Sequence, residues 1–441
     1  DEHRLSETRR FLLNAAAVGE HQIAPRKEVV EIQHVQRLDD MDPLVVSENL
    51  RRRIPQPAAR PTDPAGDTAP NPALPAGEWR AVWLSYLEWA AMDFSSEAAF
   101  RAEVSSLMDQ YAALGLNTVL AQVRPFGDAL YRSRLFPWSH LCTGVQGQDP
   151  GFDPLEVLLT EAHARALSLE AWINPYRLKS SAAMPPNLAQ DNLVHTHPEW
   201  LCTVGDGVYL NPALPEAAAY VVQGVAELVQ NYAVDGIHFD DYFYPATDPA
   251  LDAAQFAASG AADLAAWRRG NVTALVKAAH DAVKAADPTL RFGISPQGNP
   301  DNDRDQQYSD ISAWLTAAGA DAVVDYLCPQ VYWGYGYRLQ SGSTRFAFEN
   351  IVPEWLAMPR TDGVALYFGL GAYRVGTGDG GANADSLSQW CTGSALARQA
   401  ADLRAWGAGG WALYRSGSLF GPDQTELAAA ECAALAAQNG E

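Results

Sequence analysis

The segment with the clearest chemical signature runs from Val234 to Pro245 and reads VDGIHFDDYFYP. Side chains alternate between the two faces of a β-strand, so Ile237 and Phe239 share one face. His238 and Asp240 share the other face. The apolar face suits packing against helices. We therefore expect the polar face to point into an enclosed space, with Asp240 at the carboxyl end of the strand.

Asp240 and its neighbour Asp241 carry carboxyl groups, and hydrolysis of a glycosidic bond requires two of these, one protonated and one ionised. We take Asp240 as one of them, the nucleophile or base. Glu88, which directly follows the first predicted strand, is the second candidate. Asp241 is the third, because it would face away unless the strand has already ended. The remaining carboxyl groups near a strand end are Asp301, Asp303 and Asp305.

Two alternatives to this interpretation stay open. A single carboxylic acid can work with the acetamido oxygen of the substrate itself, and the ends of the fifth and sixth predicted strands carry no glutamate. Asp240 and Asp241 could also cap a turn or form a solvated pair, since acidic residues are mostly exposed.

Strand-type and helix-type segments alternate from residue 78 onward, which predicts a parallel sheet with right-handed crossovers. The predicted strands are 79–87, 118–123, 169–174, the segment that begins at 234, 291–295, 325–332, 365–370 and 409–414. The predicted helices are 96–114, 154–166, 215–232, 261–286, 309–318, 344–356, 394–406 and 424–438. Eight such units close into an α/β fold, the (β/α)8 TIM barrel, over residues 78–441. An open doubly wound sheet is the alternative, but no G-x-G-x-x-G follows the first strand.

Residues 1–77 have a different character. They carry many charges with little periodicity, and residues 55–75 are dense in proline, alanine and aspartate. This composition is typical of a linker, so we expect an amino-terminal arm that is extended or partly disordered. Within it, residues 8–19 are faintly similar to a secretory or twin-arginine signal, but the apolar part is short and we interpret it as a weak helix.

In a parallel barrel the carboxyl ends of all strands meet at one rim, called the mouth below, and active sites are built there. The polar and aromatic side chains expected at the mouth as substrate-binding groups are Arg124, Asn174, Tyr176, Arg177, His238, Tyr242, Gln297, Gln330, Tyr332, Trp333, Tyr373 and Arg415. Amides and arginines suit hydroxyl and acetamido groups, and aromatic rings suit the apolar faces of sugars. His238 either hydrogen-bonds Asp240 and fixes its charge, or is a satisfied core histidine.

Composition excludes several classes of function. The formal net charge is -22, which argues against nucleic acid or an anionic membrane as a partner. No apolar run of about 20 residues exists, so we expect no transmembrane segment. The five cysteines have no C-x-x-C spacing, and one disulfide between Cys142 and Cys202 is possible. His195 and His197 have an H-x-H spacing but lie in a predicted loop, so we expect neither a metal site nor a cofactor.

Beyond these single residues, the chain is similar to the glycosyl-hydrolase-like family ten, bacterial envelope proteins that include hydrolases of peptidoglycan glycan strands stripped of peptides. The matching segments are RAVWLSYLEW from 80, LGLNTVLAQVRPFGDALY from 114, AWINPYR from 171, HPEWL from 197, LNPALPE from 210, DGIHFDDYFYP from 235, GISP from 293 and PQVYW from 329. The resemblance implies a barrel with Asp240 at its active site. Chitinase-type barrels fit less well, because the place of their catalytic glutamate is held by Tyr242.

These observations together predict a glycoside hydrolase that works outside the cytoplasm on an amino-sugar polymer, namely the glycan of peptidoglycan. Arg124 and Arg177 are suited to meet a lactyl carboxylate, because guanidinium is planar and forked. The alternatives are a hydrolase of a neutral polysaccharide and a carbohydrate-binding barrel without catalysis, since a fold does not fix a function.

Overall fold

A computed structural model describes residues 77–422 and 424–439. The expectations for residues 1–76, an extended arm with a weak helix and a linker, lie outside the described residues. No helix in the described part of the chain is both long and apolar enough to span a membrane.

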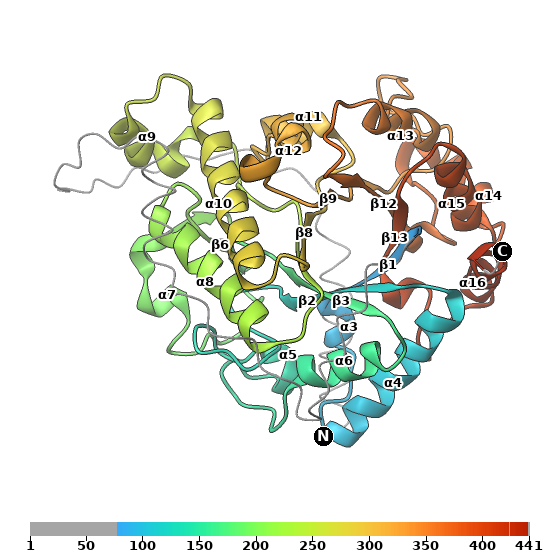
Figure 1. Ribbon diagram of the computed structural model, residues 1–441, viewed down its shortest axis with the longest axis horizontal. Helices are drawn as coiled ribbons and strands as arrows, with labels where there is room; N and C mark the ends of the chain where they lie inside the picture. The colour runs from blue at the N-terminus through green and yellow to red at the C-terminus, as the bar shows by residue number, and fades with distance from the viewer. Residues whose placement is uncertain (1–76, 423, 440–441) are drawn as a thin grey trace.

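The described chain forms a parallel barrel, as the alternation of segments predicts (Figure 1). Its strands are β1 (Trp79–Leu84), β2 (Thr118–Arg124), β3 (Ser168–Ile173), β7 (Gly236–Phe239), β8 (Arg291–Ile294), β9 (Tyr326–Leu327), β10 (Gln330–Val331), β11 (Ala365–Leu366), β12 (Phe368–Gly371) and β13 (Gly410–Tyr414). All pairings in this sheet are parallel, and the strand order is β10-β12-β13-β1-β2-β3-β7-β8-β9-β11, with β13 beside β1.

The sixth and seventh predicted strands are each divided into two short strands. β9 and β10 are separated by Cys328 and Pro329, and β11 and β12 by Tyr367. Proline has no N–H group to donate, which interrupts the ladder at Pro329. β9 pairs with β11 and β10 pairs with β12, so the ring still closes between the sixth and seventh strands.

Helices surround the strands on the outside of the barrel (Figure 1). The helices that return the chain to the next strand, together with the last one, are α4 (Glu97–Leu114), α6 (Pro154–His163), α8 (Pro215–Asn231), α10 (Leu264–Ala286), α12 (Ile311–Thr316), α13 (Phe348–Leu356), α15 (Ala395–Ala405) and α16 (Glu426–Asn439). α4 illustrates how local sequence sets their ends. The hydroxyl of Ser96 accepts a hydrogen bond from the N–H of Ala99, and Gly115 ends the helix at φ 79°.

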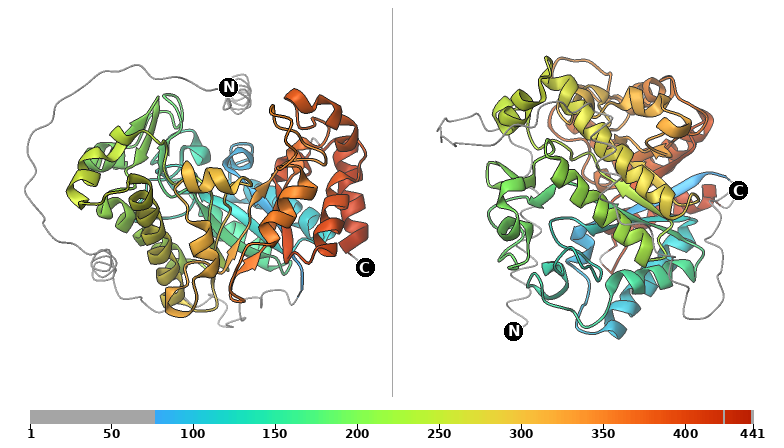
Figure 2. Two further views of the ribbon diagram at one scale, coloured as in Figure 1. Left: turned by 90° about the horizontal axis from the view of Figure 1, so that it is seen from above. Right: turned by 60° about the vertical axis from the view of Figure 1, so that its left-hand side comes forward.

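The connections contain further short elements, and Figure 2 shows some of them extending beyond the barrel. The short α-helices are α3 (Tyr86–Trp89), α5 (His140–Thr143), α7 (Leu193–Thr196), α9 (Ala253–Ser259), α11 (Pro300–Asp305) and α14 (Leu387–Trp390). The 3-10 helices are η1 (Pro198–Trp200), η2 (Pro249–Asp252), η3 (Gly319–Asp321), η4 (Ala372–Arg374), η5 (Gly381–Ser386) and η6 (Ser416–Ser418). A small antiparallel sheet of β4 (Arg177–Lys179), β6 (Gly207–Leu210) and β5 (Leu201–Val204) follows β3 and was not predicted.

Two separate cores confirm the predicted alternation of faces. Ile237 and Phe239 are fully buried in the core between strands and helices. Trp172 belongs instead to a smaller core inside the barrel, which also holds Trp79, Trp83 and Tyr326. The alternation of β3 and β7 therefore carries His238 and Trp172 inward, toward the axis below the mouth.

The disulfide that the sequence leaves possible between Cys142 and Cys202 is not formed. Cys142 and Cys202 are buried and free, and the other three cysteines are free as well, with Cys328 buried, Cys432 partly buried and Cys391 exposed. The fold consequently depends on its packed cores and not on a covalent link between loops.

Candidate active site

Asp240 lies immediately after β7, in the mouth of the barrel. Its side chain is only 3% exposed. Its Oδ2 atom accepts hydrogen bonds from Nε1 of Trp172 at 3.1 Å and from Nδ2 of Asn174 at 3.0 Å. Its Oδ1 atom accepts one longer bond, from the N–H of Tyr242 at 3.3 Å. All three donors are neutral, so no cation forms an ion pair with this buried carboxyl group.

This environment favours the protonated form of Asp240. Burial raises its pKa to about 7, and the charge of Asp241 adds to that shift, while Arg177 and the bond from Trp172 oppose it. A carboxyl group with a pKa near 7 can both give and take a proton at neutral pH.

Asp241 shares the mouth with Asp240. Because β7 ends at Phe239, strict alternation no longer applies beyond it, and Asp241 is also buried, at 6% exposure. Nε2 of Gln330 donates to Oδ1 of Asp241 at 2.9 Å and also to the carbonyl of Ser295. Burial raises the pKa of Asp241, and hydrogen bonds from Gln330 and Gln297 oppose that shift. Two amide side chains from neighbouring strand ends thus support one of two adjacent carboxyl groups.

His238 lies deeper in the barrel and is fully buried. Its Nε2 atom accepts from Nε1 of Trp83 at 3.2 Å, because an indole can only donate. Nδ1 therefore carries the proton and faces the hydroxyl of Tyr326 at 2.8 Å, which in turn donates to Glu170. Burial lowers the pKa of His238 to about 3. Its polar atoms are satisfied within the core, and its link to Asp240 is the ring of Trp172, which it meets edge to face.

Glu88 occupies a different setting from the one expected. The first strand ends at Leu84, and Ser85 starts helix α3, in which Glu88 completes a capping box. Its Oε2 atom accepts from the N–H and the hydroxyl of Ser85 at 2.8 and 2.6 Å. Its Oε1 atom accepts from the N–H of Gly417 at 2.9 Å and from Arg415, with which it forms an ion pair. Glu88 and Arg415 therefore tie the loop after β1 to the loop after β13.

Arg124 does not reach the mouth, which corrects the expectation that it binds substrate. The pairing of β2 with β3 shifts register between Gln122 and Arg124, so that Arg124 lies opposite Ile173, a helix-facing residue. A bulge of this kind turns the following side chain to the other face. Arg124 is 2% exposed and its guanidinium lies over the ring of Phe136. Burial lowers the pKa of this guanidinium.

Tyr176 is likewise removed from the mouth, since it is fully buried in the core between strands and helices. Because Tyr176 lies beyond the end of β3, the alternation of side chains along that strand does not predict which way it points. Arg177, the next residue, begins β4 and does lie at the mouth, as described further below.

Tyrosines from the last strands line another part of the rim. Tyr332 and Tyr414 stack with centroids 5.1 Å apart and an interplanar angle of 20°. Tyr373 meets both edge to face, at 5.8 and 6.0 Å. Trp333 stacks on Phe346 at 5.3 Å. These rings lie together at the rim, and Tyr242 is 53% exposed. Their binding of sugar faces stays a prediction.

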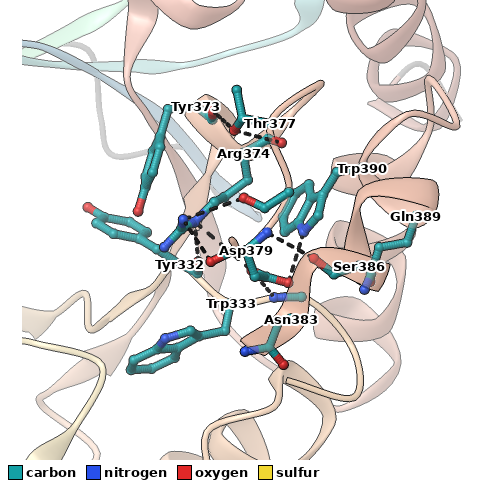
Figure 3. A network of polar contacts seen from close by, with 12 residues as sticks. Tyr332, Trp333, Tyr373, Arg374, Thr377, Asp379, Asn383, Ser386, Gln389 and Trp390 are labelled. Atoms are coloured by element: carbon teal, nitrogen blue, oxygen red, sulfur yellow. Dashed lines mark hydrogen bonds and ion pairs between the residues drawn. The ribbon is translucent and has the colours of Figure 1, made fainter. Parts of the chain in front are cut away.

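A polar network fixes the loop that carries Tyr332 and Trp333 (Figure 3). Asp379 accepts from the N–H of Gly334 at 3.0 Å and from Nε1 of Trp390 at 3.2 Å. Nε of Arg374 donates to the carbonyl of Tyr332 at 3.2 Å. Sequence reasoning missed Asp379 because it lies in a glycine-rich loop without periodicity.

A model of the family described as glycosyl hydrolase-like 10 matches residues 78–385. The chain belongs to this family. It is 34% identical over 322 residues to glycosyl hydrolase YngK of Bacillus subtilis, a match that covers 68% of this chain and 61% of YngK. It is 32% identical over 359 residues to glycosyl hydrolase DigH of Escherichia coli K12, which covers 73% of this chain and 79% of DigH.

Solved structures share the barrel of this glycosyl hydrolase-like 10 protein. The catalytic domain of a β-amylase from Paenibacillus polymyxa aligns with a TM-score of 0.52 at 12% identity, over 82% of this chain and 98% of that domain. At this identity the likeness concerns the fold alone, which confirms the TIM barrel.

In residues 77–422 and 424–439, no three His, Cys, Asp or Glu side chains are grouped to hold a metal ion. His197 instead stacks on Trp200 at 3.8 Å and pairs with Glu199.

Proposed function

We propose that this glycosyl hydrolase-like protein cleaves glycosidic bonds in an amino-sugar polymer, namely the glycan strands of peptidoglycan. The observation that carries the proposal is the buried pair of consecutive carboxyl groups, Asp240 and Asp241, at the carboxyl end of a barrel strand. Close carboxylates cannot both ionise easily, so the pair is suited to hold one proton near neutral pH.

The geometry supports a division of roles between the two carboxyl groups. Oδ2 of Asp240 already accepts two hydrogen bonds, so the proton resides on Oδ1, which has only one long contact. Asp240 donates this proton to the leaving oxygen as the bond to the anomeric carbon breaks. Asp241, ionised, faces the positive charge on that carbon. A water molecule then adds its hydroxide to the carbon and returns its proton to Asp240.

The surroundings of the pair suit a sugar polymer. The side-chain amides of Gln330 and Gln297 can exchange hydrogen bonds with hydroxyl and acetamido groups. Tyr332, Tyr373 and Trp333 offer ring faces for stacking. Because peptidoglycan lies outside the cytoplasm, the same proposal assigns the protein to an extracytoplasmic site of action.

The experiment is mass spectrometry of products from peptide-free peptidoglycan glycan, from intact sacculi and from neutral polysaccharides. The purified protein is compared with its Asp240→Asn variant, which keeps the shape of the side chain. The proposal expects shorter glycans from the peptide-free strands with the wild type and none with the variant. Release from a neutral polysaccharide alone would contradict the proposed substrate, and glycan retention without any cleavage would identify a binding barrel.

A further inference from the structure

Arg177 lies beside the reacting pair and is held in place by its neighbours. Its backbone N–H donates to Oδ1 of Asn174 at 3.0 Å, and the amide nitrogen of Asn174 donates to Asp240. Its Nε donates to the carbonyl of Pro125 at 3.1 Å. Arg177, the first residue of β4, is thereby fixed to Asn174 at the end of β3, and the same asparagine holds Asp240.

Three aromatic rings surround the guanidinium of Arg177. Its Cζ atom lies 5.0 Å from the ring centroid of Phe126, 5.6 Å from that of Tyr242 and 5.9 Å from that of Tyr86. Such contacts hold a cation without neutralising it. Tyr242 is half exposed, so this cage opens toward the solvent at the mouth.

Arg177 and Arg415 both lie at the mouth and differ in their partners. Arg415 forms an ion pair with Glu88. Arg177 has no carboxylate within ion-pair distance in the described part of the chain, and the hydrogen bond to Pro125 uses only its Nε. Its two terminal nitrogens are thus free to donate in parallel, which is the geometry that a carboxylate accepts.

We propose that Arg177 is the binding group for a carboxylate carried by a sugar next to the cleaved bond. The inference rests on the proposed function and specifies it: the substrate is an anionic glycan, and its lactyl ether supplies the carboxylate. It also gives an anionic polymer a local cationic contact at the site of a chain whose net charge is -22.

The test compares peptide-free glycan with the same glycan after chemical reduction of its carboxylates to alcohols. For the wild type we expect KM on the reduced glycan to rise about 10- to 100-fold, with a smaller change in kcat, because a charge-assisted bond is lost. Arg177→Gln should lose this discrimination and treat both glycans alike. Arg360→Gln, at an exposed arginine before β11, is the matched control and should discriminate as the wild type does.

Binding measured by calorimetry separates this inference from the proposed function. The affinity for glycan is compared between the Asp240→Asn variant and the double variant that also carries Arg177→Gln. This comparison reports carboxylate recognition even if no glycan is cleaved. Oligogalacturonate carries its carboxylate on the sugar ring and not on a lactyl ether. As a competitor it therefore distinguishes these two sources of the carboxylate. If Arg177→Gln shifts the pH profile but leaves the preference for the carboxylate intact, Arg177 acts on Asp240 and the inference is overturned.

Discussion

Two edges of the same mouth present carboxyl groups in opposite ways. At the edge formed by β3 and β7, Asp240 accepts three bonds from neutral donors. At the edge formed by β1 and β13, Glu88 accepts four bonds, one of them from the guanidinium of Arg415. Glu88 thus has a cationic partner, whereas no cation is bonded to Asp240, whose pKa is raised by burial.

Location at a strand end therefore does not by itself define a catalytic carboxyl group. Glu88 connects two loops and thereby shapes the rim. Asp240 has fewer stabilising contacts, and burial of its charge is a cost to folding, a combination typical of functional sites.

A large effect on catalysis that would sharpen this contrast is expected at Asp241. Asp241→Asn should lower kcat by about 100-fold, within the range usual for a positioned carboxyl group. The charge of Asp241 also raises the pKa of Asp240. Activity requires protonated Asp240 and should fall as pH rises through about 7, and in the variant this limb should move to lower pH. A pH profile of kcat/KM with an unmoved limb would refute the coupling.

At the edge formed by β1 and β13, a substitution should lower the free energy of unfolding more than it lowers catalytic activity. Glu88→Gln replaces an ionised acceptor by an amide and leaves buried donors without a good partner, which costs about 1–3 kcal/mol. Denaturant unfolding would measure this loss, and the alkaline limb of the pH profile should stay where it is. A variant of full stability with a displaced limb would assign Glu88 to proton transfer.

Asp240→Asn should raise the free energy of unfolding, whereas Glu88→Gln should lower it. The folded pKa of Asp240, about 7, lies above its ordinary value, so the folded state gains protons and its stability falls as pH rises toward 7. Asn carries no charge at any pH. We therefore expect the variant to exceed the wild type by about 1–2 kcal/mol at pH 8 and to lose that advantage near pH 4. Equal unfolding curves at both pH values would show that Asp240 is not strained by burial.

The smallest effect is expected at Arg124, the arginine that the bulge in β2 turns away from the mouth. Arg124→Met keeps the volume and removes a buried charge, a change that is often neutral or stabilising. Its KM should match that of the wild type within about twofold, which is a smaller change than the loss of a charged contact with substrate would cause. A large rise in KM would place Arg124 at the substrate after all.

The fold was predictable because alternation in β3 and β7 and the caps of helices such as α4 are local signals. The errors arise where local rules end. Ser85 and Glu88 form a capping box that the sequence displays, S-x-x-E, and that signal would have ended the first strand early.

No pattern of residues announces the bulge that redirects Arg124, because it depends on pairing with β3. Asp241 became a candidate of equal weight to Asp240 only once the end of β7 at Phe239 was known. Its partner Gln330 comes from a strand that is distant in sequence, so that contact required the closed barrel.

One paired measurement separates the roles of Asp240 and Glu88: kcat/KM of Asp240→Asn and of Glu88→Gln on the same peptide-free glycan, beside their unfolding free energies. The account predicts that Asp240→Asn folds stably and loses activity by about 100-fold or more. It predicts that Glu88→Gln loses stability but retains cleavage with the wild-type pH profile. An active Asp240→Asn beside a stable and inactive Glu88→Gln would contradict it.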